Sequence, residues 1–532
     1  MPTGKKFELK FPAAGVVRRI GYHDSAQLRP PYPSPWAVNC RPEDPLESRL
    51  RGGSRPGLTK ALADQLGVSI VSVTSVPTVT EDGAIPRLAV VADGALGVVG
   101  GGVLSTPVGE LLAEDGDTLL TEGNSPLLAD TGTIPSEGFT FAHGRSVYTV
   151  TSSGTSRAEV VTGVIDALTA EDGTSPSNVT HGCVYRDRLI LAGEDNAIYM
   201  SRQGDHSDWF YGADVTDLGR PTVFQLSEAG EQGQPCTALC PFKDKSLIAA
   251  TENSLWVISG DPVVDGTLRC ISRGVGIIGP RAWCSIQDAR VGDALMRYAM
   301  IFLAQDGLYV VAPDGGGLKC ISEDRLPLRF QDVTASTVNL VYSLRERGVY
   351  IFATDDVGAA SWFYDLQRGG FWPMEFASDH TYQAATLHDN DVLLVGADGY
   401  ARTFSGSTDD GEDIESHLLI GPLRAAQPGT FGQMLSHRSV LDDESGTVTW
   451  RIVTGESAEE ACENGKLAIE YFQAGDDTYE DYVAASGDWT AGRNGIVYPR
   501  TRAEWFVFWL QSTARWGYET IYAQMGQSGV VR

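Results

Sequence analysis

The fold is decided by a repeated unit whose clearest copy, residues 188–199, reads RLILAGEDNAIY. A short apolar run leads into a polar turn that contains Gly, Asn or Asp, and the next run opens with an aliphatic–aromatic pair. Asp-Gly and Asn-x pairs supply the positive φ angles that a tight hairpin loop requires. The pattern occurs six more times, at 87–96, 139–148, 246–256, 300–309, 340–350 and 392–401. Each copy therefore predicts a β-hairpin.

The spacing of the copies predicts the architecture. The residue at the aromatic position is number 96, 148, 199, 256, 309, 350 or 401, so the steps are 52, 51, 57, 53, 41 and 51. A step of about fifty residues suits a four-stranded propeller blade with long loops. One hairpin cannot bury its apolar face alone, so neighbouring units must stack to form a continuous core. We expect a mainly β chain with a β-propeller of about six to eight blades; packed β-sandwich modules are the chief alternative, since the coils of a parallel β-helix would be half as long.

Composition divides the 532 residues into three predicted parts. Residues 1–66 form an extended, basic, Pro/Arg/Gly-rich N-terminal arm with a docking role, because its clustered prolines deny it ladder donors. Residues 67–408 form the propeller. Residues 409–532 form a β-sandwich-like or barrel-like domain with longer, tryptophan-rich strands.

Short elements are predicted within the flanking parts. Alternating or apolar runs predict strands at 447–454, 466–472, 503–510 and 516–522. Helical spacing of apolar residues predicts two turns of helix at 58–66, and residues 457–463 are a second short helical candidate.

Charge is distributed unevenly along the chain. The net charge is −28, yet residues 1–60 hold eleven Lys or Arg and five acids, which makes this stretch +6 and the remainder −34. An acidic body repels a phosphate backbone, so specific nucleic-acid binding is disfavoured. The basic segment predicts docking on an acidic partner or on a neighbouring copy, although it could equally lie on its own subunit.

Docking candidates in the arm are an aromatic residue, three arginines able to form bidentate pairs with carboxylates, and a Pro-Gly turn. They are Trp36, Arg49, Arg51, Arg55, Pro56 and Gly57. No P-loop or dinucleotide-binding frame surrounds these glycines and arginines, so structural ion pairing is preferred to nucleotide binding and no cofactor is expected.

Motifs that would indicate an enzyme do not occur in the sequence. The eight histidines form no HxH or HExxH frame, and no GxSxG elbow is present. The eight cysteines are dispersed, as expected for reduced core thiols rather than a zinc site. Residues 204–209, GDHSDW, could hold a cation or a sugar, but a polar loop between blades is preferred. We therefore expect no catalytic residues and no metal site.

Export and membrane signals are also not seen in the sequence. No apolar run reaches the ~18 residues that a spanning helix needs. The first residues have no apolar stretch typical of a secretory signal. The chain is expected to be made in a cytosol and to span no membrane.

Two terminal segments carry a resemblance. Residues 49–58, RLRGGSRPGL, follow a proline-rich arm, and the end of the chain holds PRTR at 499–502 and WGYETI at 516–521. These segments resemble the tail nozzle (tail tubular protein B-like) proteins of short-tailed bacteriophages. The resemblance implies a virion subunit that forms a ring, typically of six copies, below the tail adaptor. Such a ring extends the channel through which genomic DNA leaves and anchors tail fibres or spikes.

Two other functions remain open from the sequence. One is a receptor-binding or glycan-binding, or even glycan-cleaving, tail-associated propeller, which would need aromatic side chains beside paired acids. The other is a head-to-tail connector component of the same particle. The position of the chain in the particle would distinguish a connector component from a nozzle subunit.

Overall fold

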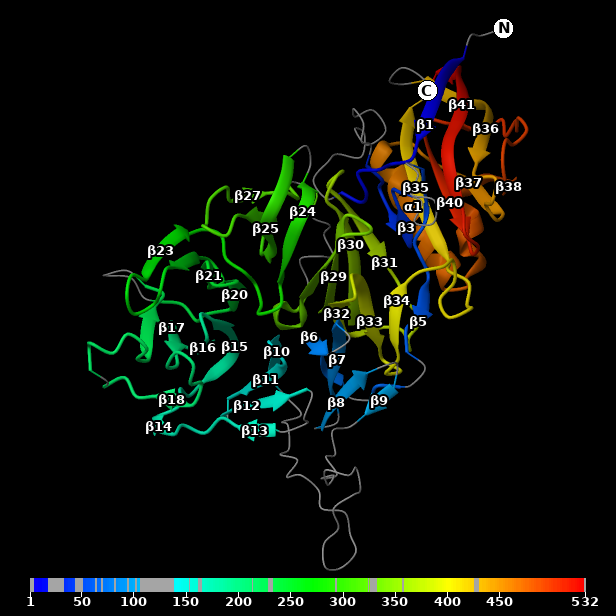
Figure 1. Ribbon diagram of the computed structural model, residues 1–532. Helices are drawn as coiled ribbons and strands as arrows, with labels where there is room; N and C mark the ends of the chain where they lie inside the picture. Colours follow the sequence, from blue (N-terminus) through cyan, green and yellow to red (C-terminus); the bar gives the residue numbers. More distant parts are fainter. Residues whose placement is uncertain are drawn as a thin grey trace, which may run out of the picture.

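The computed structural model describes residues 4–17, 33–43, 51–62, 65–67, 70–80, 83–92, 95–100, 103–105, 138–152, 154–160, 165–212, 214–227, 233–291, 294–323, 325, 333–355, 358–424 and 430–530. Strands dominate this part of the chain, so the prediction of a mainly β protein is confirmed (Figure 1). The strands form a group of small sheets and, beside it, a two-sheet sandwich.

Within the described residues, seven four-stranded antiparallel sheets follow one another along the chain and are numbered here in that order. Sheet 1 contains β6 (Ile70–Thr80), β7 (Gly83–Ala92), β8 (Ala95–Gly100) and β9 (Val103–Ser105), and sheet 2 contains β10 (Phe139–His143), β11 (Ser146–Thr151), β12 (Gly154–Glu159) and β13 (Ile165–Ala167). Sheet 3 contains β15 (Val179–Tyr185), β16 (Arg188–Gly193), β17 (Ala197–Met200) and β19 (Thr222–Gln225), and sheet 4 contains β20 (Ala238–Phe242), β21 (Ser246–Ala250), β22 (Leu255–Ser259) and β23 (Thr267–Ser272). Sheet 5 contains β24 (Trp283–Val291), β25 (Ala294–Ala304), β26 (Gly307–Val311) and β27 (Lys319–Cys320), and sheet 6 contains β28 (Asn339–Ser343), β29 (Gly348–Asp355), β30 (Gly358–Asp365) and β31 (Gly370–Met374). Sheet 7 contains β32 (Tyr382–His388), β33 (Asp391–Gly396), β34 (Ala401–Phe404) and, from the beginning of the chain, β5 (Leu58–Lys60).

Each copy of the sequence repeat lies in one of these sheets. In five copies the aromatic position falls on the third strand, whereas Tyr148 and Tyr350 lie on the second strands β11 and β29. This change of strand accounts for the short step of 41 residues before position 350. The two-residue turn Asp389–Asn390, with φ angles of 49° and 66°, has the positive φ at both positions that a tight hairpin favours.

The sheets are arranged around a common centre (Figure 1). Their first strands lie beside one another, with β10 next to β6 and β15, and β32 of sheet 7 next to β6 of sheet 1. Adjacent sheets share apolar cores; between sheets 7 and 1, for example, Leu393 and Val395 pack with Val73 and Val90. Each sheet thus buries its faces against its neighbours, as a small apolar sheet must.

The sandwich contains strands from both ends of the chain. One sheet contains β1 (Lys5–Lys10), β3 (Cys40–Arg41), β4 (Gly52–Ser54), β36 (Thr430–Leu441), β39 (Arg502–Ala503) and β41 (Gly517–Val530). The other contains β2 (Ala37–Val38), β35 (Ser416–Arg424), β37 (Val448–Gly455), β38 (Val483–Trp489) and β40 (Trp505–Ser512). Strand β41 pairs with both β1 and β4, so the two chain ends form one sheet.

Strand β40 shows why its sequence is apolar throughout. Phe506 and Phe508 join the core between the two sheets, whereas Val507 and Trp509 face α1 (Ala458–Gln473) on the other side. Alternate residues of a strand point to opposite faces, and here both faces are covered. Helix α1 is amphipathic and begins at Ser457, whose side chain accepts a hydrogen bond from the Glu460 amide.

Three predictions about the flanking parts differ from the structure. The predicted helix at 58–66 is wrong, because Leu58–Lys60 forms β5 and completes sheet 7. The strand at 466–472 is wrong, because the helical candidate at 457–463 extends through it to Gln473. The described residues of the predicted arm 1–66 do not stand apart, because they supply strands to the sandwich and to sheet 7.

Candidate functional site

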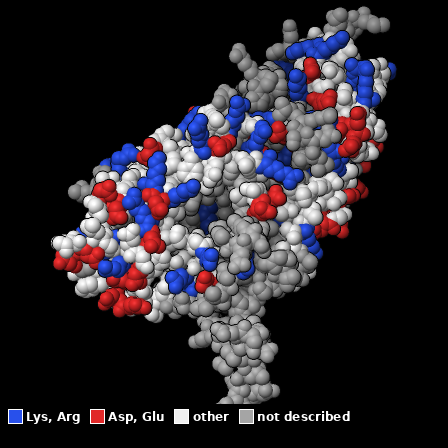
Figure 2. All heavy atoms as spheres, in the orientation of Figure 1, with Lys and Arg blue, Asp and Glu red and all other residues white. Residues whose placement is uncertain are grey.

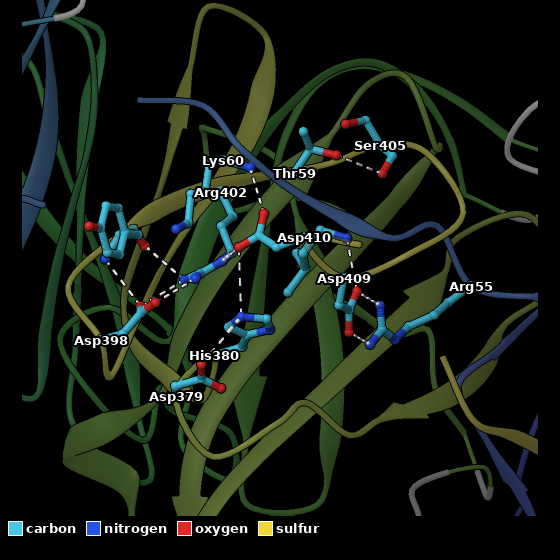
Figure 3. Close-up of polar contacts among 12 residues, drawn as sticks. Arg55, Thr59, Lys60, Asp379, His380, Asp398, Arg402, Ser405, Asp409 and Asp410 are labelled. Carbon is cyan, nitrogen blue, oxygen red and sulfur yellow. Dashed lines mark hydrogen bonds and ion pairs between the residues drawn. The ribbon is translucent and has the colours of Figure 1, made fainter. Parts of the chain in front are cut away.

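A cluster of buried ion pairs surrounds β5, where the N-terminal segment completes sheet 7. On one edge β5 pairs with β34, which places Leu58 opposite Phe404 and Lys60 opposite Arg402. On its other side the Asp409 carboxylate accepts the Leu58 amide at 2.9 Å and the Asp410 carboxylate accepts the Lys60 amide at 3.0 Å. Adjacent aspartates thus hold both ends of a three-residue strand. Arg55, Asp398, Arg402, Asp409 and Asp410, with β5, are called the closing latch (Figure 3).

Arg55 is a fully buried member of the closing latch. Its guanidinium donates to both oxygens of Asp409, at 2.9 and 2.5 Å, and its Nε donates to Asn39 Oδ1 at 2.8 Å. The Phe376 ring lies 4.7 Å from the guanidinium carbon. The Arg55 and Asp409 side chains are 1% and 8% exposed, so this is a buried bidentate ion pair whose remaining donors find acceptors.

Arg402 forms the second ion pair of the closing latch. Its NH1 and NH2 groups donate to Asp398 at 2.8 and 2.5 Å, and its Nε donates to Asp410 at 2.7 Å. Burial raises the pKa of Asp398, but the hydrogen bonds from Arg402 outweigh this effect and leave that pKa below its ordinary value. The carboxylates in turn raise the pKa of Arg402 against the opposing effect of burial. The pair is therefore charged on both sides at neutral pH.

Three potential metal ligands lie at the closing latch. Ligand atoms of Asp379, His380 and Asp398 lie within 4.8 Å of one another, and His380 is 5% exposed. Both oxygens of Asp398 already accept hydrogen bonds from Arg402, whose positive charge stands where a divalent cation would have to bind. The donor set therefore suits an arginine better than a metal ion, and Asp398 serves the closing latch.

The two segments that carry the family resemblance meet in the sandwich. Strand β4 pairs Gly52 with Tyr518 and Gly53 with Gly517. A Cβ on Gly53 would lie 1.9 Å from the Trp516 carbonyl oxygen, so this position requires glycine. The Arg51 guanidinium lies 3.0 Å from Asp442, which also pairs with Arg515 at 3.0 Å.

The structure gives different positions to the predicted docking residues. Arg51, Arg55, Pro56 and Gly57 are buried against their own chain, so ion pairing within the subunit, not an accessible docking face, is what the structure shows for both arginines. Trp36 is half-buried on the core between α1 and β40, which supplies the apolar cover that a tryptophan in this segment needs.

Arg49 lies outside the described residues. A docking role therefore stays a prediction for Trp36 and Arg49. The other four predicted docking residues are buried and expose little surface to a partner.

The loop at 204–209 has partners within the chain. His206 Nδ1 lies 3.0 Å from the Tyr148 hydroxyl, Asp205 accepts from Ser207, and Asp208 accepts the Phe210 amide. Most of its polar groups thus serve the loop itself, as expected for a connection between strands.

The eight cysteines are free and are buried or half-buried. Burial raises the pKa of the Cys236 thiol to about 12, so this thiol is an unreactive core group, as the sequence predicted. In the described part of the chain, no helix has the length and apolar character needed to cross a bilayer.

Sequence reasoning missed Asp409 and Asp410. The only local signal was a pair of adjacent acids directly after the last repeat, and acids are common in this chain. Their partners are more than 340 positions away at Leu58 and Lys60, so local periodicity could not reveal them.

Comparison with known proteins identifies no family. No family model matches the sequence, and no curated protein matches it. Solved structures that match include the computationally designed Ika8 protein, at 15% identity and a TM-score of 0.33 over 65% of this chain and 100% of that one. BamB from Moraxella catarrhalis matches at 11% identity and a TM-score of 0.35 over 66% of this chain and 98% of that one. A chain of the Mitotic Checkpoint Complex matches at 10% identity and a TM-score of 0.36 over 66% and 95%, respectively.

Proposed function

We propose that the chain is a structural subunit of a phage tail nozzle ring, in which a closed seven-bladed β-propeller and a β-sandwich act as one rigid body. The propeller is supported by the seven successive four-stranded sheets and by the contact of sheet 7 with sheet 1. The nozzle assignment rests on the resemblance of the terminal segments, which the fold brings together in the sandwich.

The observation that carries an assembly role is an exposed apolar surface on the segment that follows β18 (Asp208–Trp209) and continues into β19. Five large apolar side chains on fourteen consecutive residues are more than one-third exposed: Phe210 49%, Tyr211 40%, Val215 78%, Leu218 60% and Val223 38%. Single exposed apolar residues are ordinary, but a group this dense is typical of an interaction surface. These residues are called the rim patch. In Figure 1, β17 and β18 lie on the side of the sheets farthest from the sandwich.

Charge at the two ends of the molecule is complementary. Figure 2 shows acidic side chains gathered at the end where the rim patch lies and several basic side chains at the tip of the sandwich. Asp214 and Asp217 belong to the rim segment, whereas the exposed Lys5, Lys6 and Lys10 belong to β1 of the sandwich. Unlike surfaces at opposite ends favour head-to-tail contacts between copies, and such contacts close into a ring when the rotation per copy permits it.

A buried apolar core joins the seven sheets to the sandwich, as a rigid structural subunit requires. Phe11 of the N-terminal segment stacks on Trp372 of β31 with ring centroids 5.4 Å apart, and Trp372 is fully buried. The Asn39 amide donates to the Pro373 carbonyl. One apolar core contains residues of sheets 6 and 7 and of both sandwich sheets. Relative motion of the two units would expose this core.

The experiment is sedimentation of the purified chain over a range of concentrations. The unchanged chain should form a closed oligomer, and a variant carrying Val215→Asp and Leu218→Asp should sediment as a monomer with an unchanged circular dichroism spectrum. The control is Leu295→Asp, because Leu295 is 61% exposed on β25, away from the rim patch. A monomer at all concentrations that releases reducing sugars from a bacterial envelope polysaccharide would contradict the proposal and favour a glycan-cleaving propeller.

A further inference from the structure

A half-buried arginine lies among the first strands of the sheets. Arg281 lies two residues before β24 of sheet 5, yet its NH2 group lies 3.1 Å from Ser72 Oγ of β6 and 3.3 Å from Thr140 Oγ1 of β10. The Phe139 ring lies 5.2 Å from its guanidinium carbon. The side chain thus reaches from sheet 5 to sheets 1 and 2, across the common centre. In Figure 2 the surface is hollowed near the middle of the seven-sheet unit, and a basic side chain is visible in the hollow.

Arg281 differs from the arginines of the closing latch because no described carboxylate pairs with it. Arg55 and Arg402 each hold at least one acid, whereas no ion pair joins Arg281 to any described residue. Burial lowers the pKa of Arg281, and the neighbouring group that opposes this is the Tyr382 phenol. Arg281 is half-buried, so water screens part of its charge, and no described acid pairs with it although the chain holds 69 acidic residues.

Several N–H groups of the Arg281 guanidinium have no hydrogen-bond acceptor among the described residues. NH2 binds two hydroxyl groups, and no described residue accepts a hydrogen bond from NH1 or Nε. Ser72 and Thr140 accept from the guanidinium, so the Thr140 hydroxyl keeps its own hydrogen for another acceptor, whereas the Ser72 hydroxyl also lies 3.5 Å from Thr74 Oγ1. The His181 ring lies 6.1 Å from that of Phe139; His181 is 2% exposed, and burial lowers its pKa to about 4, so at neutral pH it adds no charge.

We propose that Arg281, Ser72 and Thr140 form a binding site for a small oxyanion at the centre of the sheets. A phosphate, sulfate or carboxylate group offers the planar or tetrahedral array of acceptors that a guanidinium and two hydroxyl groups can bind together. The bound anion supplies a negative charge that no described residue around Arg281 provides. Binding ties sheet 5 to sheets 1 and 2 and therefore stabilises the folded chain.

The test is titration of the purified full chain with sodium phosphate, sodium sulfate and sodium acetate, followed by calorimetry at constant ionic strength set with chloride. One anion per chain is expected to bind, and the same anion should raise the thermal midpoint. Arg281→Gln should weaken binding about tenfold or more, the loss expected when charged hydrogen bonds are removed. The matched control is Arg202→Gln, because Arg202 already pairs with Asp208 and Asp217 and should not contribute.

A second variant keeps the test decisive where Arg281→Gln fails to fold. Ser72→Ala combined with Thr140→Val retains the guanidinium and should still weaken anion binding, with acetate, which has fewer acceptors, affected least. Binding of equal strength in Arg281→Gln or in the hydroxyl variant would overturn the proposal. So would the absence of both calorimetric heat and ³¹P line broadening when the unchanged chain is titrated with phosphate.

Discussion

Replacing Arg55 with methionine tests how the closing latch holds β5 in sheet 7. The change removes the bidentate pair with Asp409 and the bond to Asn39, and it leaves a carboxylate that is 8% exposed without its counter-charge. Breaking a buried ion pair on one side costs about 3–5 kcal/mol. The strand is only three residues long and pairs with a single neighbour, β34, so we expect this loss to appear as local opening of β5 rather than as unfolding of the whole chain.

The assay is amide hydrogen exchange of the peptide that contains Leu58–Lys60, measured by mass spectrometry. When exchange follows the opening equilibrium, 3–5 kcal/mol corresponds to exchange faster by about two to three and a half orders of magnitude. The control is Arg345→Met, because the Arg345 and Asp391 side chains are 60% and 51% exposed. An exposed pair contributes about 0–1 kcal/mol, so this control should leave exchange in β5 unchanged.

A double variant separates the ion pair from general damage. Arg55→Met combined with Asp409→Leu leaves no buried charge and should open less readily than either single variant, although the Leu58 amide then loses its acceptor. The role of the ion pair is contradicted if the β5 amides exchange at the same rate in Arg55→Met and in the unchanged chain. It is also contradicted if the loss of opening free energy in the double variant equals the sum of the losses in the two single variants.

Two further predictions concern the sandwich. Burial lowers the pKa of His437 to about 4 and that of His417 to about 3, so both stay neutral in the folded chain while the unfolded chain binds protons below about pH 6.5. These two histidines should therefore leave the free energy of unfolding unchanged above pH 6.5 and lower it as the pH falls toward 4, by about 3 kcal/mol for His437 alone. The thermal midpoint of His437→Phe should depend less steeply on pH than that of the unchanged chain. An equal dependence on pH in the two proteins would contradict the lowered pKa of His437. Gly53→Ala should lower the thermal midpoint by several degrees because its Cβ would meet the Trp516 carbonyl at 1.9 Å, whereas Gly274→Ala, with open space at Cβ, should not; equal midpoints for the two variants would refute the packing role of Gly53.

The repeats could be predicted because their signal is local. A short apolar run, a turn residue that tolerates positive φ and a second run lie within about twelve residues, and each such copy lies in one sheet. The sequence could not assign Tyr148 and Tyr350 to second strands, since the hairpins between strands 1 and 2 and between strands 2 and 3 use the same turn chemistry.

Contacts between distant segments were beyond the reach of the sequence. Leu58–Lys60 has helical spacing of apolar residues with the positions that follow, but pairing with β34 outweighs this local preference. Residues 466–472 look like a strand in isolation, and only the cap at Ser457, nine positions earlier, assigns them to α1. The charge of Arg51 and Arg55 suggested ion pairs, but that their acids, Asp442 and Asp409, belong to the same chain is evident only from the fold.

Electron cryomicroscopy of the intact particle that contains this chain tests the proposed role most directly. The proposal predicts a closed ring of copies around the DNA channel below the tail adaptor, with the rim patch of each copy covered by the sandwich of its neighbour. Copies placed away from the channel axis, or rim patches open to solvent, would contradict it.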